Sequence, residues 1–221
     1  MKRVLVTAGR SNLGKSIREV FEKEGYEVFY TVSSEDKADS EKAIAADLTK
    51  EKEIDKALEK LESLDVLVNN AGIFTEGSQE TLSIESFGAV MALNVKGLFL
   101  VTRKLIPLLK KSDGSIVNVS SMNAVHPGFG ATSHYDASKG AVSAYTASLA
   151  AETGLRVNAV APGLIDTQRL HGAKLESHWK NHTVKREMVK PEYIANAILF
   201  LAQSRGIYGQ TLLIDNGYCL R

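Results

Sequence analysis

The sequence has one cysteine and almost no net charge, and each shortage excludes a class of function. Cys219 stands alone in 221 residues, which excludes an intramolecular disulfide framework and any cysteine-based zinc cluster and fits a reducing cytosol. The 27 basic and 26 acidic residues leave a net charge of +1, so no overall field attracts nucleic acid or a membrane surface. We see no apolar run near the roughly eighteen residues that span a bilayer. We therefore expect a cytoplasmic protein with a small-molecule partner.

Short β-branched segments alternate with helical patterns along the whole chain. Seven segments predict strands, at residues 3–7, 27–32, 43–46, 64–68, 115–119, 156–161 and 211–214. Apolar residues at a 3.6-residue period predict helices near 14–24, 54–61, 84–109, 136–152 and 191–203. Strand segments that are apolar throughout belong to sheets covered on both faces. The pattern predicts one α/β domain over residues 1–221, with a doubly wound, seven-stranded parallel sheet.

The first strand runs through a turn of small residues into a helix. This is the context that a dinucleotide site requires, because the pyrophosphate of a dinucleotide binds at a helix N-terminus. The turn holds two glycines, Gly9 and Gly14, and a plain strand-to-helix turn would look the same. In parallel sheets of this kind, ligands bind at the carboxyl ends of the strands.

Tyr135 and Lys139 stand four residues apart, and Ser121 ends an apolar strand upstream. Residues at i and i+4 of a helix share a face, so the ammonium group would lie beside a phenol whose ordinary pKa is about 10. A neighbouring cation favours the phenolate, and we expect Lys139 to lower the pKa of Tyr135. The alternative is a surface Tyr–Lys pair without chemistry.

These motifs together resemble the short-chain dehydrogenase/reductase family. The matching residues occur in the family's order and extend along the whole chain. They are Thr7 and Gly14 of the Gly-rich turn, Asn69-Asn-Ala-Gly72, Asn94, Ser121, the Tyr-X-X-X-Lys pair Tyr135 and Lys139, and the stretch from Pro162 to Thr167. The resemblance implies a NAD(P)-binding Rossmann fold and hydride transfer between the cofactor and a carbonyl or secondary alcohol. It implies that the cofactor is held by Thr7, Gly9, Arg10, Asn12, Leu13, Gly14, Ser33, Asp47, Leu48, Asn70, Ala71, Gly72, Pro162, Gly163, Ile165 and Thr167, together with Tyr135 and Lys139.

The resemblance also implies a role for each catalytic residue. Tyr135 exchanges a proton with the substrate oxygen, Ser121 orients and polarises the carbonyl, and Lys139 tunes Tyr135 and binds the nicotinamide ribose. Asn94 holds a water of the proton relay. Ser120 is the rival serine, but the family pattern places the second serine of the pair in the pocket.

The first turn departs from the family's Thr-Gly-X-X-X-Gly-X-Gly pattern. Ala8 and Asn12 stand where the first two glycines are expected. Asparagine tolerates the left-handed backbone better than most residues, so we expect Asn12 to preserve the turn and to add a side chain near the phosphates.

The end of the second strand bears on the choice between NADP(H) and NAD(H). NAD-preferring relatives carry an acidic residue where this chain has Val32, so nothing at that position repels a 2′-phosphate. Arg10 and Ser33 or Ser34 could bind the phosphate, although Ser11 occupies the family's usual basic position. We expect NADP(H), with NAD(H) as the alternative because Glu35 and Asp36 lie nearby.

Residues 168–190 occupy the place of the family's substrate lid. The segment contains Arg169, Lys174, Lys180, Lys185, Arg186 and Lys190 against Glu176 and Glu187, together with Trp179, His171, His178 and His182. It predicts either a pocket for an anionic or carrier-linked carbonyl, such as a 3-oxoacyl thioester, or a solvated charged helix. The i, i+4 histidines lack the companion glutamate of a His-Glu-X-X-His zinc site, and we expect no metal.

Three functions remain open at this point. The first is an NADPH-dependent carbonyl reductase that resembles 3-oxoacyl carrier-protein reductases, and the second is a sugar or polyol dehydrogenase. The third is a nucleotide-sensing protein with a vestigial site. The resemblance also implies a homodimer or homotetramer that forms through the helices of Asn94 and Tyr135. The apolar residues there could form the interface or could face the protein's own sheet; they are Leu98, Phe99, Val142 and Tyr145.

Overall fold

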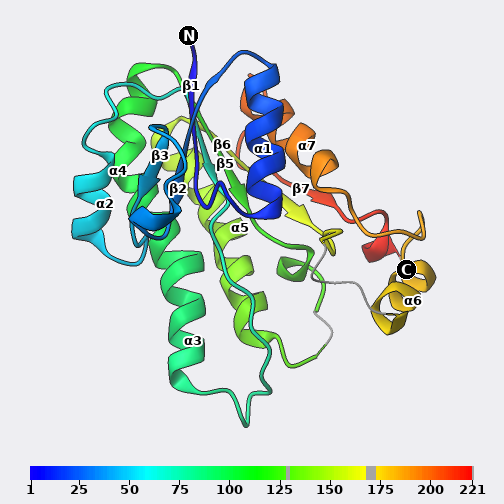
Figure 1. The fold of residues 1–221 in the computed structure, drawn as a ribbon. Coiled ribbons are helices and arrows are strands. Elements are labelled where there is room, and N and C mark those ends of the chain that lie inside the picture. The colour runs from blue at the N-terminus through cyan, green and yellow to red at the C-terminus, as the bar shows by residue number, and fades with distance from the viewer. Residues whose placement is uncertain (128–129, 168–172, 221) are drawn as a thin grey trace.

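A seven-stranded parallel sheet organises the chain (Figure 1). The computed structural model describes residues 1–127, 130–167 and 173–220. The strands are β1 (Arg3–Val6), β2 (Glu27–Val32), β3 (Ala43–Ala45), β4 (Val66–Asn69), β5 (Ser115–Val119), β6 (Arg156–Pro162) and β7 (Thr211–Ile214). They lie in the order β3-β2-β1-β4-β5-β6-β7, which confirms the predicted doubly wound sheet.

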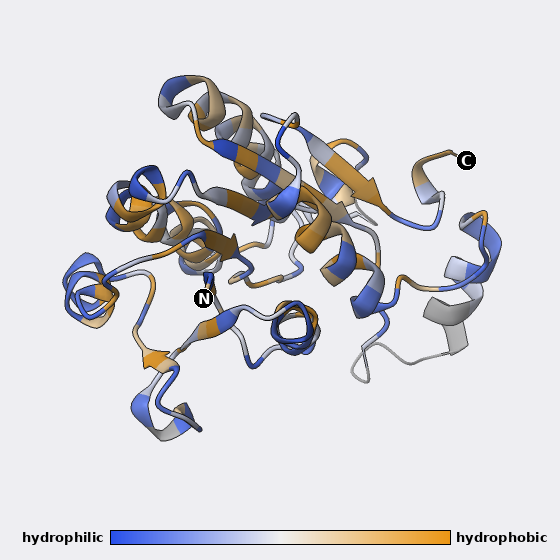
Figure 2. Ribbon diagram, turned by 90° about the horizontal axis from the view of Figure 1, so that it is seen from above, coloured by the Kyte–Doolittle hydropathy of each residue, from blue (hydrophilic) through white to orange (hydrophobic). Residues whose placement is uncertain are grey.

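Helices cover both faces of the sheet because successive strand residues point to opposite sides. The helices are α1 (Asn12–Lys23), α2 (Glu51–Leu58), α3 (Ile84–Met91), α4 (Leu98–Lys111), α5 (Ser133–Thr153), α6 (Ala173–His182) and α7 (Pro191–Gln203). Val4 and Val6 pack with α1 and α7 on one face, and Leu5 packs with α2 and α4 on the other. Figure 2 shows largely orange and brown strands in the middle of the fold, flanked by helices whose ribbons alternate between orange and blue.

One long helix contains an irregular turn. Residues 84–111 run as α3, the π-helix η2 (Ala92–Gly97) and α4 without a break. This helix is long and apolar enough to cross a membrane, judged by length and composition alone. The sequence patterns did not predict an apolar segment of that length. Leu100, Leu105 and Leu109 are buried against the sheet, so its inner face belongs to the protein core.

Four buried polar side chains tie this helix and α5 to the centre of the sheet. Asn69 Nδ2 donates to Thr102 Oγ1 at 2.9 Å and to Asn118 Oδ1 at 2.8 Å. Asn118 Nδ2 in turn donates to Thr146 Oγ1 at 2.9 Å. A buried polar group that loses its partner costs about 1–3 kcal/mol, so this chain of hydrogen bonds fixes how α4 and α5 sit on β4 and β5.

The turn between β1 and α1 lacks two of the family's glycines, and its backbone differs from our expectation. The prediction of a left-handed Asn12 is wrong, because Asn12 is the first residue of α1 and the left-handed residue is Ala8, with φ of 52°. Gly14 must stay glycine, since a Cβ there would lie 2.4 Å from the carbonyl oxygen of Ala8. Ser11 caps the helix by accepting a hydrogen bond from Gly14 N at 3.0 Å.

Ala8→Gly should therefore stabilise the protein. The left-handed backbone costs an alanine about 1–2 kcal/mol, and the greater freedom of glycine in the unfolded chain offsets part of that relief. We expect the free energy of unfolding in urea to rise by about 0.5–1 kcal/mol. Ala57→Gly, within helix α2, is the matched control and should lose about 1 kcal/mol. A loss of stability in Ala8→Gly would contradict this account of the turn.

Candidate active site

The predicted catalytic residues converge at the carboxyl ends of β4 and β5. Ser121 follows β5 and caps the short helix η3 (Met122–Ala124), and Tyr135 lies in the first turn of α5. Ser121 and Tyr135 are joined by a side-chain hydrogen bond. Ser120 points elsewhere, since its Oγ donates to the carbonyl of Lys139 at 2.9 Å and contacts Ser143 Oγ at 2.8 Å. The geometry therefore pairs Ser121, and not Ser120, with the tyrosine.

Lys139 is a buried charge. Only 5% of the residue is exposed, and Nζ donates to the carbonyl oxygen of Val119 at 2.8 Å. Burial disfavours the charged form and lowers the pKa of Lys139 to about 8. The ammonium lies 5.8 Å from the centre of the Tyr135 ring.

The expectation that Lys139 lowers the pKa of Tyr135 is wrong for this structure. Burial is the largest influence and raises the pKa of Tyr135, the negative charge of Asp136 raises it further, and only the hydrogen bond with Ser121 lowers it. The reason is that Lys139 aims its ammonium at Val119. The phenol is consequently protonated at neutral pH, which is the form that donates a proton.

Asn94 stands in the π-helix and joins three elements. Its Oδ1 accepts from Ile73 N at 2.8 Å, while its Nδ2 donates to Ile73 O at 3.0 Å and to Ser138 Oγ at 3.1 Å. A Cβ on Gly72 would lie 3.1 Å from Asn94 Oδ1 and 3.4 Å from Lys139 Nζ, so glycine leaves room for both groups. Sequence patterns did not predict the π-helix, a distortion that is frequent at functional sites.

Side chains also join the two Gly-containing turns across the sheet. Thr7 Oγ1 accepts from Asn70 N at 2.9 Å and from Ala71 N at 2.8 Å. Asn70 Nδ2 donates to Thr7 O at 2.9 Å and to Ser11 Oγ at 3.2 Å. The predicted cofactor residues Thr7, Asn70 and Ala71 thus lie together at the start of α1, whose first-turn N–H groups, including that of Leu13, suit a pyrophosphate.

A cluster of charged side chains lies at the end of β2. Arg10 donates to the carbonyl of Lys37 at 2.8 Å and pairs with Asp39 at 3.6 Å. Lys37 Nζ donates to Ser33 Oγ at 2.9 Å. Arg10 and Ser33 were predicted, whereas Lys37 and Asp39 were missed, although both follow closely after the second strand. The two cations and the hydroxyl group there suit the binding of a phosphate, whereas the negative charge of Asp39 would repel one.

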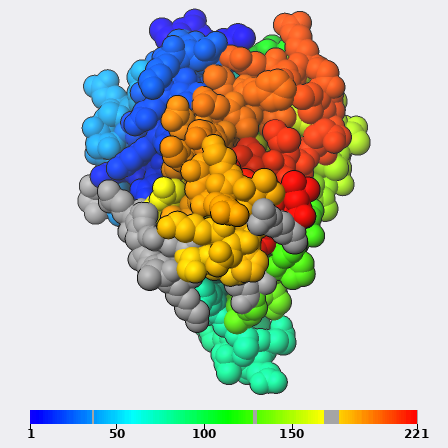
Figure 3. All heavy atoms as spheres, turned by 90° about the vertical axis from the view of Figure 1, so that its right-hand side faces the viewer, coloured from blue at the N-terminus to red at the C-terminus, as the bar shows by residue number. Residues whose placement is uncertain are grey.

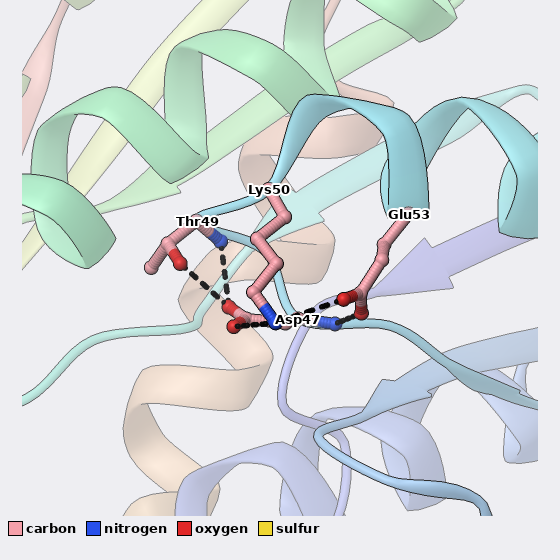
Figure 4. Close-up of polar contacts among 4 residues, drawn as sticks. All are labelled: Asp47, Thr49, Lys50 and Glu53. Atoms are coloured by element: carbon pink, nitrogen blue, oxygen red, sulfur yellow. Dashed lines mark hydrogen bonds and ion pairs between the residues drawn. The ribbon is translucent and has the colours of Figure 1, made fainter.

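Asp47 and Leu48 lie beyond β3. The Asp47 carboxylate accepts a hydrogen bond from Thr49 N at 2.9 Å and pairs with Lys50 at 3.4 Å (Figure 4). These contacts lower the pKa of Asp47. Leu48 is buried, and its carbonyl faces Gly97 of the π-helix, so the second predicted residue packs in the core. Asp47 is the one with a side chain at the surface of this edge.

The segment after β6 forms the far side of the site. Gly163 N donates to Ile214 O at 2.9 Å, and Ile165 pairs with Val189 in a short parallel bridge. Pro162 is the last residue of β6, and Thr167 is the last described residue before the predicted lid. These residues and the stretch that leaves the lid are therefore held side by side.

Within the segment predicted to be a lid, α6 is docked against the rest of the protein and is not a fully solvated helix. Trp179 is 1% exposed and packs with Met122 and Tyr218. Figure 3 shows α6 beside the C-terminal residues coloured red. His178 Nε2 lies 3.2 Å from the Tyr218 hydroxyl. His171 lies outside the described residues, and in the described part of the chain no group of histidines, cysteines and acids could hold a metal.

Known proteins resemble this chain over nearly its whole length. A family model described as enoyl-(acyl carrier protein) reductase matches residues 7–219. The 3-oxoacyl-(acyl-carrier-protein) reductase FabG of Thermotoga maritima is 35% identical, with 96% of each chain covered. The ligand-free aldohexose dehydrogenase of Thermoplasma acidophilum superposes with a TM-score of 0.91 at 31% identity, covering 100% of this chain and 94% of that one.

A further solved structure, ElxO with NADP bound, gives a TM-score of 0.87 at 29% identity and covers 100% of this chain and 99% of its own. The fold agrees with these relatives from the first strand to the last. We conclude that the chain belongs to the short-chain dehydrogenase/reductase family, a family of NAD(P)-dependent oxidoreductases that act on the carbonyl and alcohol groups of small molecules.

Proposed function

We propose that residues 1–221 act as one NAD(P)-binding domain, with a lid at about 168–190, and reduce a small-molecule carbonyl with NADPH. The observation that carries the proposal is the hydrogen bond between Ser121 and a partly buried, protonated Tyr135, with Lys139 and Asn94 beside it. A protonated phenol in reach of a polarising hydroxyl suits proton donation to a carbonyl oxygen.

Each residue then has a distinct task. Ser121 donates a hydrogen bond that orients the carbonyl, and Tyr135 transfers its proton to the carbonyl oxygen. When bound, the cofactor supplies the hydride. Lys139 contributes a positive charge and further donors beside Tyr135, and Asn94 holds the Ile73 backbone in place at the edge of the site.

The preference for NADP(H) follows from the cluster at the end of β2. Arg10, Lys37 and Ser33 offer two cations and a hydroxyl for a 2′-phosphate, and the buried Val32 offers no carboxylate against it. The NADP bound to ElxO supports the same choice. Dissociation constants for NADPH and NADH, measured by fluorescence, test it: tighter binding of NADH would contradict the preference.

The basic lid favours an anionic or carrier-linked substrate, and a 3-oxoacyl thioester is the leading candidate. The described residues 173–190 contain five basic side chains, Lys174, Lys180, Lys185, Arg186 and Lys190, against the two acidic ones of Glu176 and Glu187. The likeness to FabG points the same way. The aldohexose dehydrogenase supports a second candidate, oxidation of a sugar or polyol. A nucleotide-sensing role without catalysis is the least supported, since the four catalytic positions are occupied.

A panel of ketones, 3-oxoacyl thioesters and sugars, followed by NADPH absorbance at 340 nm, distinguishes these functions. Turnover of thioesters or simple ketones supports the reductase. Turnover of sugars alone with the oxidised cofactor would favour the second candidate, and cofactor binding without any turnover would favour the third.

We further propose a cytoplasmic homodimer or homotetramer, formed through the pair of helices that carry Asn94 and Tyr135. An open groove of about 570 Å³ between these helices is lined by Leu98, Phe99, Val142 and Tyr145 among other apolar residues. Phe99 is 41% exposed, which favours contact with a second copy. Light scattering after size exclusion should give two or four chains per particle, and a monomer would contradict the proposal.

Tyr135→Phe should lower kcat by orders of magnitude and leave the dissociation constant of NADPH nearly unchanged, because the change removes only the hydroxyl that donates the proton. Tyr193→Phe, on the exposed surface of α7, is the matched control and should keep full activity. Full activity in Tyr135→Phe would overturn the catalytic assignment.

Lys139→Met should abolish activity and yet stabilise the fold at pH 7. The pKa of Lys139 falls from 10.5 to about 8, so a charged lysine costs the folded state up to about 3 kcal/mol below pH 8. The lost hydrogen bond to Val119 offsets about 1 kcal/mol. The wild-type lysine is neutral in the folded state above pH 8 and loses its penalty towards pH 10.5, so the advantage of the variant shrinks over that range.

Urea unfolding of both proteins at pH 7 and pH 9.5 measures this difference. Lys110→Met, on the exposed face of α4, is the control and should change stability by less than about 0.5 kcal/mol at either pH. A stability difference for Lys139→Met that does not depend on pH would contradict the buried charge.

A further inference from the structure

Phe74 is an exposed aromatic residue that is nevertheless held in place. Its side chain belongs to a residue 52% exposed, directly after Ile73, which is 37% exposed. Its ring meets the ring of Tyr135 edge to face, with 4.9 Å between centres and 83° between planes. Ile73 and Phe74 therefore place an exposed apolar surface directly beside the proposed proton donor.

Hydrogen bonds clamp the residues on both sides of Phe74. Asn94 makes two hydrogen bonds with the backbone of Ile73, at 2.8 and 3.0 Å. On the other side, Thr75 Oγ1 lies 2.8 Å from Nε2 of the buried His134, and Ser86 Oγ donates to Thr75 at 3.3 Å. The segment between β4 and α3 therefore runs along the start of α5 (Figure 1), and Phe74 is preorganised.

A carbonyl that hydrogen-bonds the Tyr135 hydroxyl must bring its substituents close to this ring. We infer that Phe74 is a specificity-determining residue, an apolar wall that favours carbonyls with an alkyl or aryl substituent over polyhydroxylated ones. The inference rests on the proposed function and narrows its substrate class. It is independent of the basic lid, which lies on other elements.

The physical reason is that burial against the ring has opposite effects on the binding free energy of alkyl and hydroxyl substituents. An alkyl group gains about 0.8 kcal/mol for each methylene that it buries against the ring. A hydroxyl group pressed against the ring loses water and finds no hydrogen-bond partner on it. The same ring shields the Tyr135 phenol from water, in agreement with the raised pKa of Tyr135.

The test compares two matched ketones, ethyl 3-oxohexanoate and ethyl 6-hydroxy-3-oxohexanoate, in wild type, Phe74→Ala and Phe74→Leu. We expect Phe74→Ala to lower the ratio of kcat/KM for the apolar over the hydroxylated ketone by about tenfold, mainly through KM. Phe74→Leu should retain much of the ratio. The dissociation constant of NADPH should stay unchanged in both variants.

Two further variants separate a wall from a merely structural role. Phe200→Ala removes a similarly exposed phenylalanine, 55% exposed on α7, and should leave the ratio unchanged. Thr75→Val keeps Phe74 but loosens its clamp, and should lower the ratio by less than Phe74→Ala does. An unchanged ratio in Phe74→Ala overturns the inference alone. A wild-type protein that binds NADPH but reduces neither these ketones nor any 3-oxoacyl thioester overturns the proposed function and the inference with it.

Discussion

The buried ammonium of Lys139 is the constraint on which the arrangement of the site depends. A cation removed from water needs a fixed acceptor, and the carbonyl of Val119 at the end of β5 provides one at 2.8 Å. Gly72 leaves space for that cation and for Asn94, since a Cβ would approach both. The carboxyl ends of β4 and β5, the π-helix and α5 are thereby held at close quarters around the hydroxyl groups of Ser121 and Tyr135.

Burial has a second consequence, because the same environment acts in opposite directions on its two titratable groups. It lowers the pKa of Lys139 to about 8 and raises the pKa of Tyr135. The buried charge of Lys139 costs the folded state stability, but it fixes the ammonium close to Tyr135. A protonated tyrosine beside such a lysine is an arrangement suited to the reduction of a carbonyl. The polar chain from Thr102 through Asn69 and Asn118 to Thr146 holds the supporting helices so that this balance is preserved.

The fold and the residue types of the site could be predicted from the sequence because they follow from local rules. Alternating apolar segments specify the sheet, and helical spacing places Tyr135 and Lys139 on one helix. What failed depends on contacts distant in sequence. The direction of the Lys139 ammonium depends on a strand twenty residues earlier, as its bond to Val119 shows. The left-handed backbone of Ala8 and the π-helix around Asn94 depend on packing against other elements. The residue types at these positions do not predict either feature.

The central claim is that burial keeps Tyr135 protonated at neutral pH, and the titration of its phenol tests this most directly. Protein labelled with carbon-13 at tyrosine Cζ would be titrated by NMR in the absence of cofactor, with Tyr135→Phe identifying the resonance. The account predicts no ionisation of Tyr135 below pH 10, consistent with its raised pKa. A resonance half-titrated near pH 7 would contradict it.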